Sequence, residues 1–330
     1  MGNGRFDFHE ESEKTDIEYV SAEQNGFKEA IYRFQKNKGA VVGFFFVVII
    51  ILFSIFEPML SPYAYDEINT SLQNLPPRIP IIEKLGIFNG TAKGINMYTG
   101  EALADKYFFF GTDTLGRDIF LRVFSGTRIS LLIAVIAAGV DMVIGVTYGL
   151  ICGYYGGKVD LIMQRIIEII HSIPNLVVVT MLMLIFKPGV GSIIIALLIS
   201  GWIGMSRLIR AQTLKLKEQE YVLACRTLGV KDSKIIFGEI LPNTSGQIII
   251  RTMTSIPGAI FMESFLSYIG LGIPAPQASL GSLISDGYKV MLIYPYQLIL
   301  PALLFAILMI SLNLVADGLR DALDPKMKDM

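Results

Sequence analysis

The chain has 330 residues, of which 52% are hydrophobic and 17% are charged, and its net charge is −1. Soluble domains carry about 25% charged residues, and a charge balance near zero gives no basic field of the kind that attracts nucleic acid. Uncharged runs recur at about 20 residues, the length that an α-helix needs to cross a bilayer. These features predict an all-α, polytopic membrane protein that is surrounded by lipid and binds no nucleic acid.

Taken in chain order, residues 1–38 are polar and end in a basic cluster, which predicts a tail with a surface helix. The first transmembrane helix is predicted within 39–60, where the stretch 39–56 holds no charge. Prolines, an Asn-Gly pair and scattered charges then break the pattern over 61–126. This predicts an irregular soluble excursion that leads into an amphipathic segment.

Residues 127–319 hold the remaining hydrophobic runs, and residues 320–330 form a short charged tail. Five further spans are predicted, which gives six in all. The third is interrupted by Pro174 and carries charges in its first half. The five spans are 130–153, 161–186, 190–208, 248–271 and 296–316.

The distribution of positive charge predicts the orientation, because Lys and Arg concentrate in short cytoplasmic loops. The stretch 207–239 lies between spans four and five and holds seven basic residues, whereas the short links on the opposite side hold Lys187 and Lys289. Counting crossings from a cytoplasmic 207–239 places both termini in the cytoplasm and 61–126 outside. The basic cluster at the end of 1–38 agrees with this orientation.

The segment 212–242 is polar between two hydrophobic runs and has the pattern of two short helices joined by a glycine. Gly229 tolerates the left-handed turn that ends a helix, Asp232 or Ser233 can cap the next one, and Leu241-Pro242 closes the segment. The first helix offers an apolar stripe at near-helical spacing: Tyr221, Val222, Ala224, Cys225 and Leu228. Two readings are open, an ordinary loop between spans or a docking surface for a protein outside the membrane.

No motif for catalysis or cofactor binding occurs in the sequence. There is no G-x-x-x-x-G-K-[ST] phosphate loop and no H-E-x-x-H zinc motif, and the two histidines, His9 and His171, lack ligand-like neighbours. We therefore predict a chain that is not an enzyme and holds neither a metal nor a cofactor of its own.

Three acidic residues within the spans are candidates for the translocation path or for gating. Ionisable groups in a membrane are costly and usually face a bundle interior or water. Asp141 lies in span two and Glu263 in span five, and each can line the path, contact a partner or be a hydrogen-bonded structural carboxylate. Glu168 follows Arg165 by three residues, a spacing that predicts a local ion pair and leaves a gating role open.

Several motifs resemble those of importer-type ABC permeases. Glu220, Ala224, Gly229, Leu241 and Pro242 match the E…A…G…LP skeleton of the family's EAA loop, with Cys225 where a second alanine is usual. The segment Phe110–Asp118 (FGTDTLGRD) is similar to the motif that precedes span two in C-type subunits of peptide permeases. Further matches in family order extend the resemblance over about 28–328; they lie at 126–131, 156–160, 212–214, 263–272 and 318–326.

The resemblance implies a type I ABC importer permease fold in a bacterial cell membrane, acting as a subunit of an ATP-driven oligopeptide importer. The EAA loop at about 212–242 would form coupling helices that dock on an ATPase subunit, through Glu220, Tyr221, Ala224, Cys225, Arg226, Gly229, Leu241 and Pro242. Implied partners are a second, B-type permease subunit, two ATPase subunits that bind ATP and magnesium, and a lipid-anchored or periplasmic peptide-binding protein.

Three alternatives remain open from the sequence alone. A self-sufficient secondary transporter or channel would need an ion-coupling network, which Asp141, Glu168 and Glu263 can supply. A membrane anchor or sensor scaffold would use 212–242 to bind a signalling enzyme. Within the importer reading, the cargo can be a dipeptide, a nickel chelate or another small solute instead of an oligopeptide.

Overall fold

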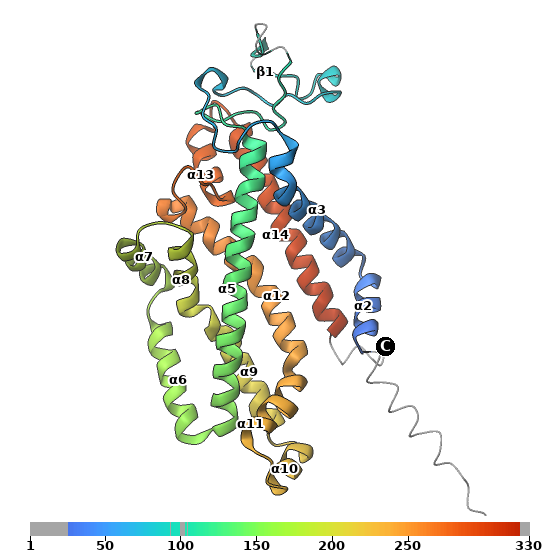
Figure 1. Cartoon of the computed structure of the whole chain (residues 1–330), viewed down its shortest axis with the longest axis vertical. Coiled ribbons are helices and arrows are strands. Elements are labelled where there is room, and N and C mark those ends of the chain that lie inside the picture. The colour runs from blue at the N-terminus through green and yellow to red at the C-terminus, as the bar shows by residue number, and fades with distance from the viewer. Residues whose placement is uncertain (1–25, 93, 100–102, 104, 324–330) are drawn as a thin grey trace, which may run out of the picture.

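A computed structural model describes residues 26–92, 94–99, 103 and 105–323, and nearly all of its regular structure is helical (Figure 1). The all-α prediction is confirmed, with one addition, a short antiparallel hairpin whose strands, β1 (Thr91–Ala92) and β2 (Ile95–Asn96), have two residues each. The tails predicted at 1–25 and 324–330 lie outside the described residues. We call the two ends of the molecule the β1 end and the α10 end, after the elements that lie there in Figure 1.

Most helices of the bundle lie along the axis between these two ends, and α7 lies across its side (Figure 1). The helices of the bundle and its edges are α2 (Gly26–Lys36), α3 (Lys38–Leu60), α5 (Ile119–Tyr155), α6 (Gly157–Ser172), α7 (Asn175–Phe186), α8 (Val190–Ser200), α9 (Trp202–Leu216), α12 (Leu241–Leu266) and α14 (Tyr296–Leu323). The short elements are η1 (Thr70–Leu72), η2 (Ile82–Leu85), α10 (Glu220–Thr227), α11 (Asp232–Ile235), the π-helical η3 (Ile236–Ile240) and η4 (Ser267–Leu271), and α13 (Leu280–Val290).

The helices differ in how well they match the six predicted spans. Four stretches within the described residues are long and apolar enough to cross a membrane: Lys38–Met59, Ile119–Tyr155, Val190–Leu216 and Tyr296–Leu323. The pair α6 and α7 would be a fifth as a broken span, bent by 77°. The predicted fifth span corresponds to α12, which is long enough but not apolar enough. By length and composition, the described residues thus supply at most five membrane-spanning stretches, whereas the sequence analysis predicts six.

Local residues explain where the boundaries differ from the prediction. Helix α5 begins at Ile119, not near 130, because Asp118 caps it by accepting a hydrogen bond from the Phe120 amide at 2.8 Å. The bend between α6 and α7 lies at Ile173-Pro174, as the interrupting proline predicts, since a residue before proline is driven out of the helical region. Helix α13 lies between the predicted fifth and sixth spans, where no span is predicted. Its capping box of Ser279 and Ser282 starts it.

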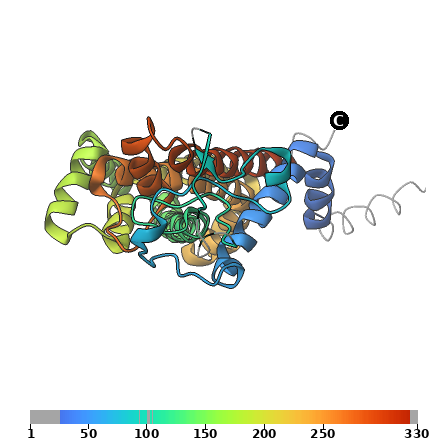
Figure 2. The same ribbon diagram turned by 90° about the horizontal axis from the view of Figure 1, so that it is seen from above.

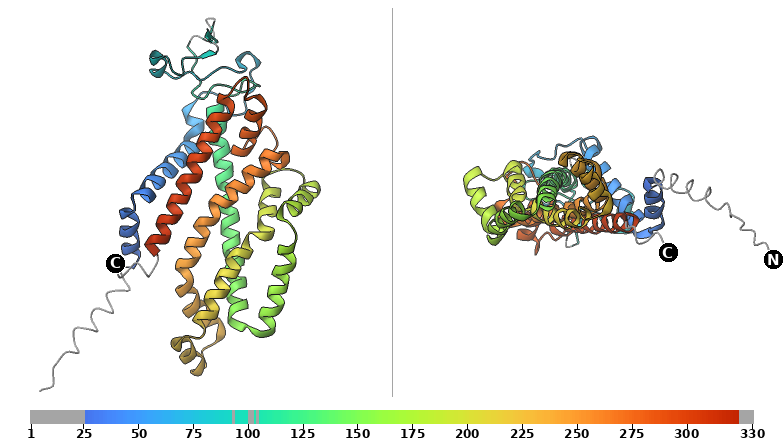
Figure 3. Two further views of the ribbon diagram at one scale, coloured as in Figure 1. Left: turned by 180° about the vertical axis from the view of Figure 1, so that it is seen from behind. Right: turned by 90° about the horizontal axis from the view of Figure 1, so that it is seen from below.

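Helix α5 is the centre of the bundle and packs against α3, α9 and α12, while α14 packs along α3 (Figures 1 and 3). Seen from above, α6 and α7 form one edge and α2 and α3 the other (Figure 2). Small residues let α5 and α9 approach closely, as is common between membrane helices. Gly145, Gly149 and Gly153 follow one another every four residues on α5, and a Cβ at any of them would lie 2.6 Å from an atom of α9.

The excursion at the β1 end has a small core of its own, formed by Leu72, Leu75, Tyr98 and Phe108. The FGTDTLGRD segment joins it to the bundle. The Thr112 hydroxyl donates to the Leu72 carbonyl and accepts from the Leu75 amide at 2.8 Å. The motif is thus the link between this excursion and the start of α5.

Candidate functional site

The segment at the α10 end has the conformation that the sequence predicts, two short helices joined at a glycine. Helix α10 ends at Thr227, and Gly229 adopts a left-handed conformation with φ +72°. The Val230 amide then donates to the Cys225 carbonyl at 3.0 Å. The predicted capping is wrong. Lys231 precedes the first turn of α11, no side chain caps it, and Asp232 is already inside the helix.

The apolar residues of α10 lie on two faces instead of one stripe. Val222 is fully buried and Cys225 partly buried in a core that includes Ile235 and Ile240 from the following segment. Tyr221, Ala224 and Leu228 are exposed, with Leu228 82% exposed. Their spacing of three and four residues places these three on one helical face. Val222 and Cys225 therefore fix α10 to its own chain, and the face of Tyr221, Ala224 and Leu228 is exposed.

Helix α10 and its continuation are anchored to the end of α5 through Tyr154. The Tyr154 hydroxyl donates to the Asp232 carboxylate at 2.7 Å, and the Arg226 guanidinium lies 4.7 Å above the Tyr154 ring. The Lys217 ammonium donates to the Gly153 carbonyl at 2.8 Å. Arg226 thus has an intramolecular contact, while Glu220 is exposed in the first turn of α10, where a negative charge complements the helix dipole.

A second set of contacts ties α5, α6 and α9 together just behind this segment. The Arg210 guanidinium donates twice to the Asp160 carboxylate, at 2.6 and 2.5 Å, and the buried Cys152 thiol donates to the same carboxylate at 2.8 Å. Bidentate pairs of this kind fix geometry as well as charge. Beyond them, Leu241 is half-buried, and exposed Pro242 occupies the first turn of α12, where its missing N–H is not needed.

The three acidic candidates for the path lie apart from one another. Glu168 is exposed on α6 and pairs with Arg165 at 2.5 Å, so the predicted ion pair is confirmed. Glu263 is fully buried on α12 and accepts hydrogen bonds from Ser130, Ser264 and Ser267 at 2.6, 3.3 and 2.8 Å. This arrangement matches the alternative in which Glu263 is a hydrogen-bonded structural carboxylate. Among the described residues, no hydrogen bond or ion pair joins any two of the three acidic groups.

Asp141 of α5 is the third candidate, and its carboxylate rests against Gly201, the residue between α8 and α9. A Cβ on that glycine would lie 2.3 Å from one carboxylate oxygen. Arg251 of α12 is close enough to act electrostatically on Asp141, and a Cβ on Gly204 would lie 2.4 Å from its guanidinium. Two oppositely charged side chains thus lie at a notch formed by Gly201, which precedes α9, and Gly204 in the first turn of α9.

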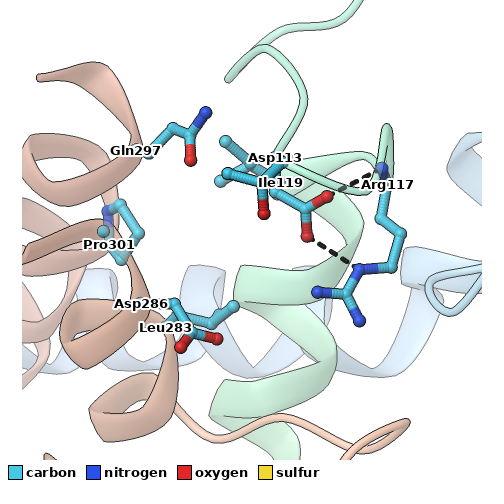
Figure 4. A pocket seen from close by; sticks show the side chains of 9 residues that line it. Asp113, Arg117, Ile119, Leu283, Asp286, Gln297 and Pro301 are labelled. Atoms are coloured by element: carbon cyan, nitrogen blue, oxygen red, sulfur yellow. Dashed lines mark hydrogen bonds and ion pairs between the residues drawn. The ribbon is translucent and has the colours of Figure 1, made fainter. Parts of the chain in front are cut away.

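A small cavity of about 40 Å³ lies at the β1 end, between the start of α5 and helices α13 and α14 (Figure 4). Asp113 and Arg117 lie on one side of it, joined by a hydrogen bond of 2.7 Å, and Asp286 of α13 lies on the other. The cavity is large enough for water and too small for a peptide. We assign it to the packing of the excursion against the bundle.

Sequence reasoning missed the residues that fix the segment in place. Tyr154 and Asp232 are 78 positions apart, and Asp160 and Arg210 are 50 apart. An aromatic residue at the end of a span is common in membrane proteins, so nothing local marked Tyr154. Arg251 lies near the start of the predicted span 248–271, and nothing in the local sequence indicates that it reaches Gly204.

Comparisons with known proteins agree with these features. A model of the family "Binding-protein-dependent transport system inner membrane component" matches residues 145–329, and one of the "N-terminal TM domain of oligopeptide transport permease C" matches residues 27–77. The oligopeptide transport system permease protein OppC of Bacillus subtilis (strain 168) is 45% identical over 92% of this chain and 90% of its own length.

Two dipeptide transport system permease proteins, both named DppC, are similar in the same way. The protein of Bacillus subtilis (strain 168) is 42% identical over 91% of this chain and 86% of its own length. That of Lactococcus lactis subsp. cremoris (strain MG1363) is 44% identical over 91% of this chain and 90% of its own. A solved inward-facing form of the MetNI methionine ABC transporter aligns with 60% of this chain and 94% of its own, at 17% identity and a TM-score of 0.49.

Proposed function

The chain belongs to the family of binding-protein-dependent transport system inner membrane components, as a non-catalytic permease subunit, and from this premise we propose that it carries oligopeptides in an ATP-driven importer. Its relatives include permeases named for oligopeptides and for dipeptides. A dipeptide, nickel-chelate or other small-solute cargo is the alternative to be tested.

The exposed face of α10 is the observation that best supports the proposed coupling mechanism. Tyr221, Ala224 and Leu228 point away from the chain on a short helix that is held at its base by Tyr154. An exposed apolar face on a firmly anchored helix is typical of a protein interface. We propose that this face docks on an ATPase subunit, with Glu220 and Arg226 at its border and Gly229 allowing close approach.

Transport against a gradient requires that ATP binding and hydrolysis favour one conformation over another, because a ligand shifts an equilibrium only through differential affinity. The sequence has no phosphate loop, so the energy enters through a partner that binds ATP and magnesium. A movement at α10 reaches α5 through Tyr154 and α12 through the continuous backbone of α11 and η3. These contacts support a mechanism in which the bundle alternates its opening between the two sides.

The proposed assembly contains this chain, a B-type permease subunit, two ATPase subunits and a peptide-binding protein outside the cell. The α10 end and both termini would face the cytoplasm of a bacterial cell. The β1 end, with the excursion and α13, would receive the binding protein, which is lipid-anchored or periplasmic.

Co-purification tests the coupling surface. Losing one central apolar contact of an interface costs about 2 kcal/mol, roughly thirtyfold in affinity, so Leu228→Asp should strip most of the ATPase subunits from the complex. Leu223→Asp is the matched control, because Leu223 is 47% exposed on the other side of α10. Equal loss from both variants, or no ATPase bound to the unmodified chain, would refute the proposal.

Uptake by the reconstituted complex tests the cargo. ATP-dependent accumulation of a labelled tetrapeptide, with weak competition by dipeptides and nickel chelates, is the expected result. Stronger accumulation of a dipeptide or a nickel chelate would replace the oligopeptide assignment. Proton-driven uptake by the purified chain alone would instead favour a secondary transporter.

A further inference from the structure

Helix α12 carries a stripe of polar and small residues along one of its faces. Gln247, Arg251, Thr254 and Gly258 recur at spacings of four, three and four residues, which places them on one face. All four are exposed or half-buried, and a Cβ on Gly258 would meet no atom within 4 Å. The face is therefore open in this chain.

A polar face of this kind does not suit lipid. Together with the buried Glu263, these residues lower the hydropathy of α12, which is not among the stretches apolar enough to cross a membrane by themselves. Ionisable residues inside membrane proteins usually face a water-filled cavity or another charge. Arg251 lies ten residues from the start of α12, about 15 Å along it, and its side chain is exposed. The polar stripe thus has the properties of a lining for an aqueous passage.

Neighbouring residues position the Arg251 side chain. Its guanidinium reaches α9 at Gly204, one turn from Gly201, where the Asp141 carboxylate rests. Among the described residues, neither Arg251 nor Asp141 forms an ion pair within 4.0 Å, and one Asp141 oxygen is buried without a hydrogen-bond partner. Asp141 is thus close enough to orient the Arg251 guanidinium electrostatically but too far away to form an ion pair with it. Arg251 keeps its planar donors available for another carboxylate.

We propose that Arg251, positioned by Asp141 at the Gly201–Gly204 notch, binds the terminal carboxylate of the cargo peptide as it crosses the membrane. This rests on the proposed transport of peptides and names a cargo contact within it. A carboxylate is the group that a guanidinium fork recognises best. Every linear peptide with a free C-terminus carries one, so a single arginine can serve cargoes of many sequences.

Uptake by the reconstituted complex of tetra-alanine and of tetra-alanine amide tests the contact. Hydrogen bonds between charged groups are worth about tenfold or more in binding. Arg251→Gln should lower tetra-alanine uptake at least tenfold and change uptake of the amide less than twofold. Arg251→Lys should recover part of the loss, because it keeps the charge without the fork. Arg207→Gln, the same change at an exposed arginine of α9, should alter neither.

The variant Gly204→Ala tests the positioning without removing any charge. Its Cβ would displace only the flexible end of Arg251, so the complex should assemble normally. Its preference for tetra-alanine over the amide should nevertheless fall several-fold. Arg251→Cys, in a chain with Cys152→Ser and Cys225→Ser, should be labelled by an anionic, membrane-impermeant thiosulfonate, because the passage is aqueous.

Loss of tetra-alanine uptake together with labelling of Arg251→Cys supports the contact. Unchanged tetra-alanine uptake, or absence of labelling, overturns it. Equal losses for the two peptides overturn it in favour of a partner subunit's carboxylate. A complex that carries no peptide at all, even with the unmodified chain, refutes the proposed function itself.

Discussion

The crossing of α5 and α9 makes a quantitative prediction about Gly149. A Cβ there would lie 2.6 Å from the Ser206 carbonyl oxygen and 2.8 Å from the Ile209 Cβ, whereas ordinary contact begins at 3.4 Å. The closest atom belongs to the backbone, so Gly149→Ala requires α9 to move away by about 0.8 Å (3.4 minus 2.6). Overpacking of this kind costs about 1–3 kcal/mol.

Gly139→Ala is the matched control, because Gly139 lies on the same helix and a Cβ there would meet nothing within 4 Å. Both substitutions gain the same helix propensity, up to about 1 kcal/mol, so the difference between them isolates the packing cost. Gly149→Ala should therefore be about 1–3 kcal/mol less stable than Gly139→Ala.

Unfolding by SDS in mixed micelles measures this difference, with the Cys152 thiol as the reporter. Cys152 is fully buried near the same crossing, and Cys225→Ser removes the other thiol. A maleimide dye then reacts only as the bundle opens. Equal stability of the two alanine variants would refute the close approach of α5 and α9.

Three further predictions concern contacts at the two ends of α5. Tyr154→Phe removes the hydrogen bond to Asp232 and should lower the free energy of unfolding by about 0.5–1.5 kcal/mol in the same SDS titration; no change would mean that the bond does not anchor α11. Asp160→Asn leaves Arg210 without its charge partner and weakens the acceptor of the Cys152 thiol, so maleimide labelling of Cys152 in the folded chain should become faster; an unchanged rate would contradict the role of the pair. Burial raises the pKa of Asp118 to about 7 from 3.8, so between these values the folded chain holds a proton that the unfolded chain releases, and stability should fall as pH rises from about 4 to 7. Asp118→Asn keeps the helix cap and should flatten that dependence when unfolding is compared at pH 5 and pH 8, whereas an identical slope in the variant would refute the assignment.

Local patterns in the sequence were enough for much of the fold. The first and last spans follow from uncharged runs and the second from an apolar run with the single charge of Asp141. The bend at Pro174 follows from backbone sterics, and the turn at Gly229 from its tolerance of positive φ. The family motifs were sufficient to identify the permease class. These features depend on residues that are neighbours in the chain, which is why the sequence alone predicts them.

Features that depend on distant contacts were not predictable in the same way. Val222 looks like part of an outward apolar stripe until Ile235 and Ile240 are seen to cover it. Glu263 and Asp141 are both acidic residues in spans, yet three serines surround one and a glycine notch holds the other. Helix α12 was expected to be one more apolar span, because its polar residues are spread along the sequence and gather only on the helical surface.

The length of α5 has a consequence for how the two ends of the molecule communicate. At 37 residues it is about 55 Å long, against about 30 Å of hydrocarbon. One unbroken helix therefore begins next to the excursion, capped by Asp118, and ends at Tyr155, one residue after the Tyr154 that contacts α10 and α11. The rotational orientation of one end about the helix axis is therefore fixed relative to that of the other end. Inserting one residue in the middle would turn one end against the other by about 100°, so the chain tolerates substitution along α5 far better than a change in its length.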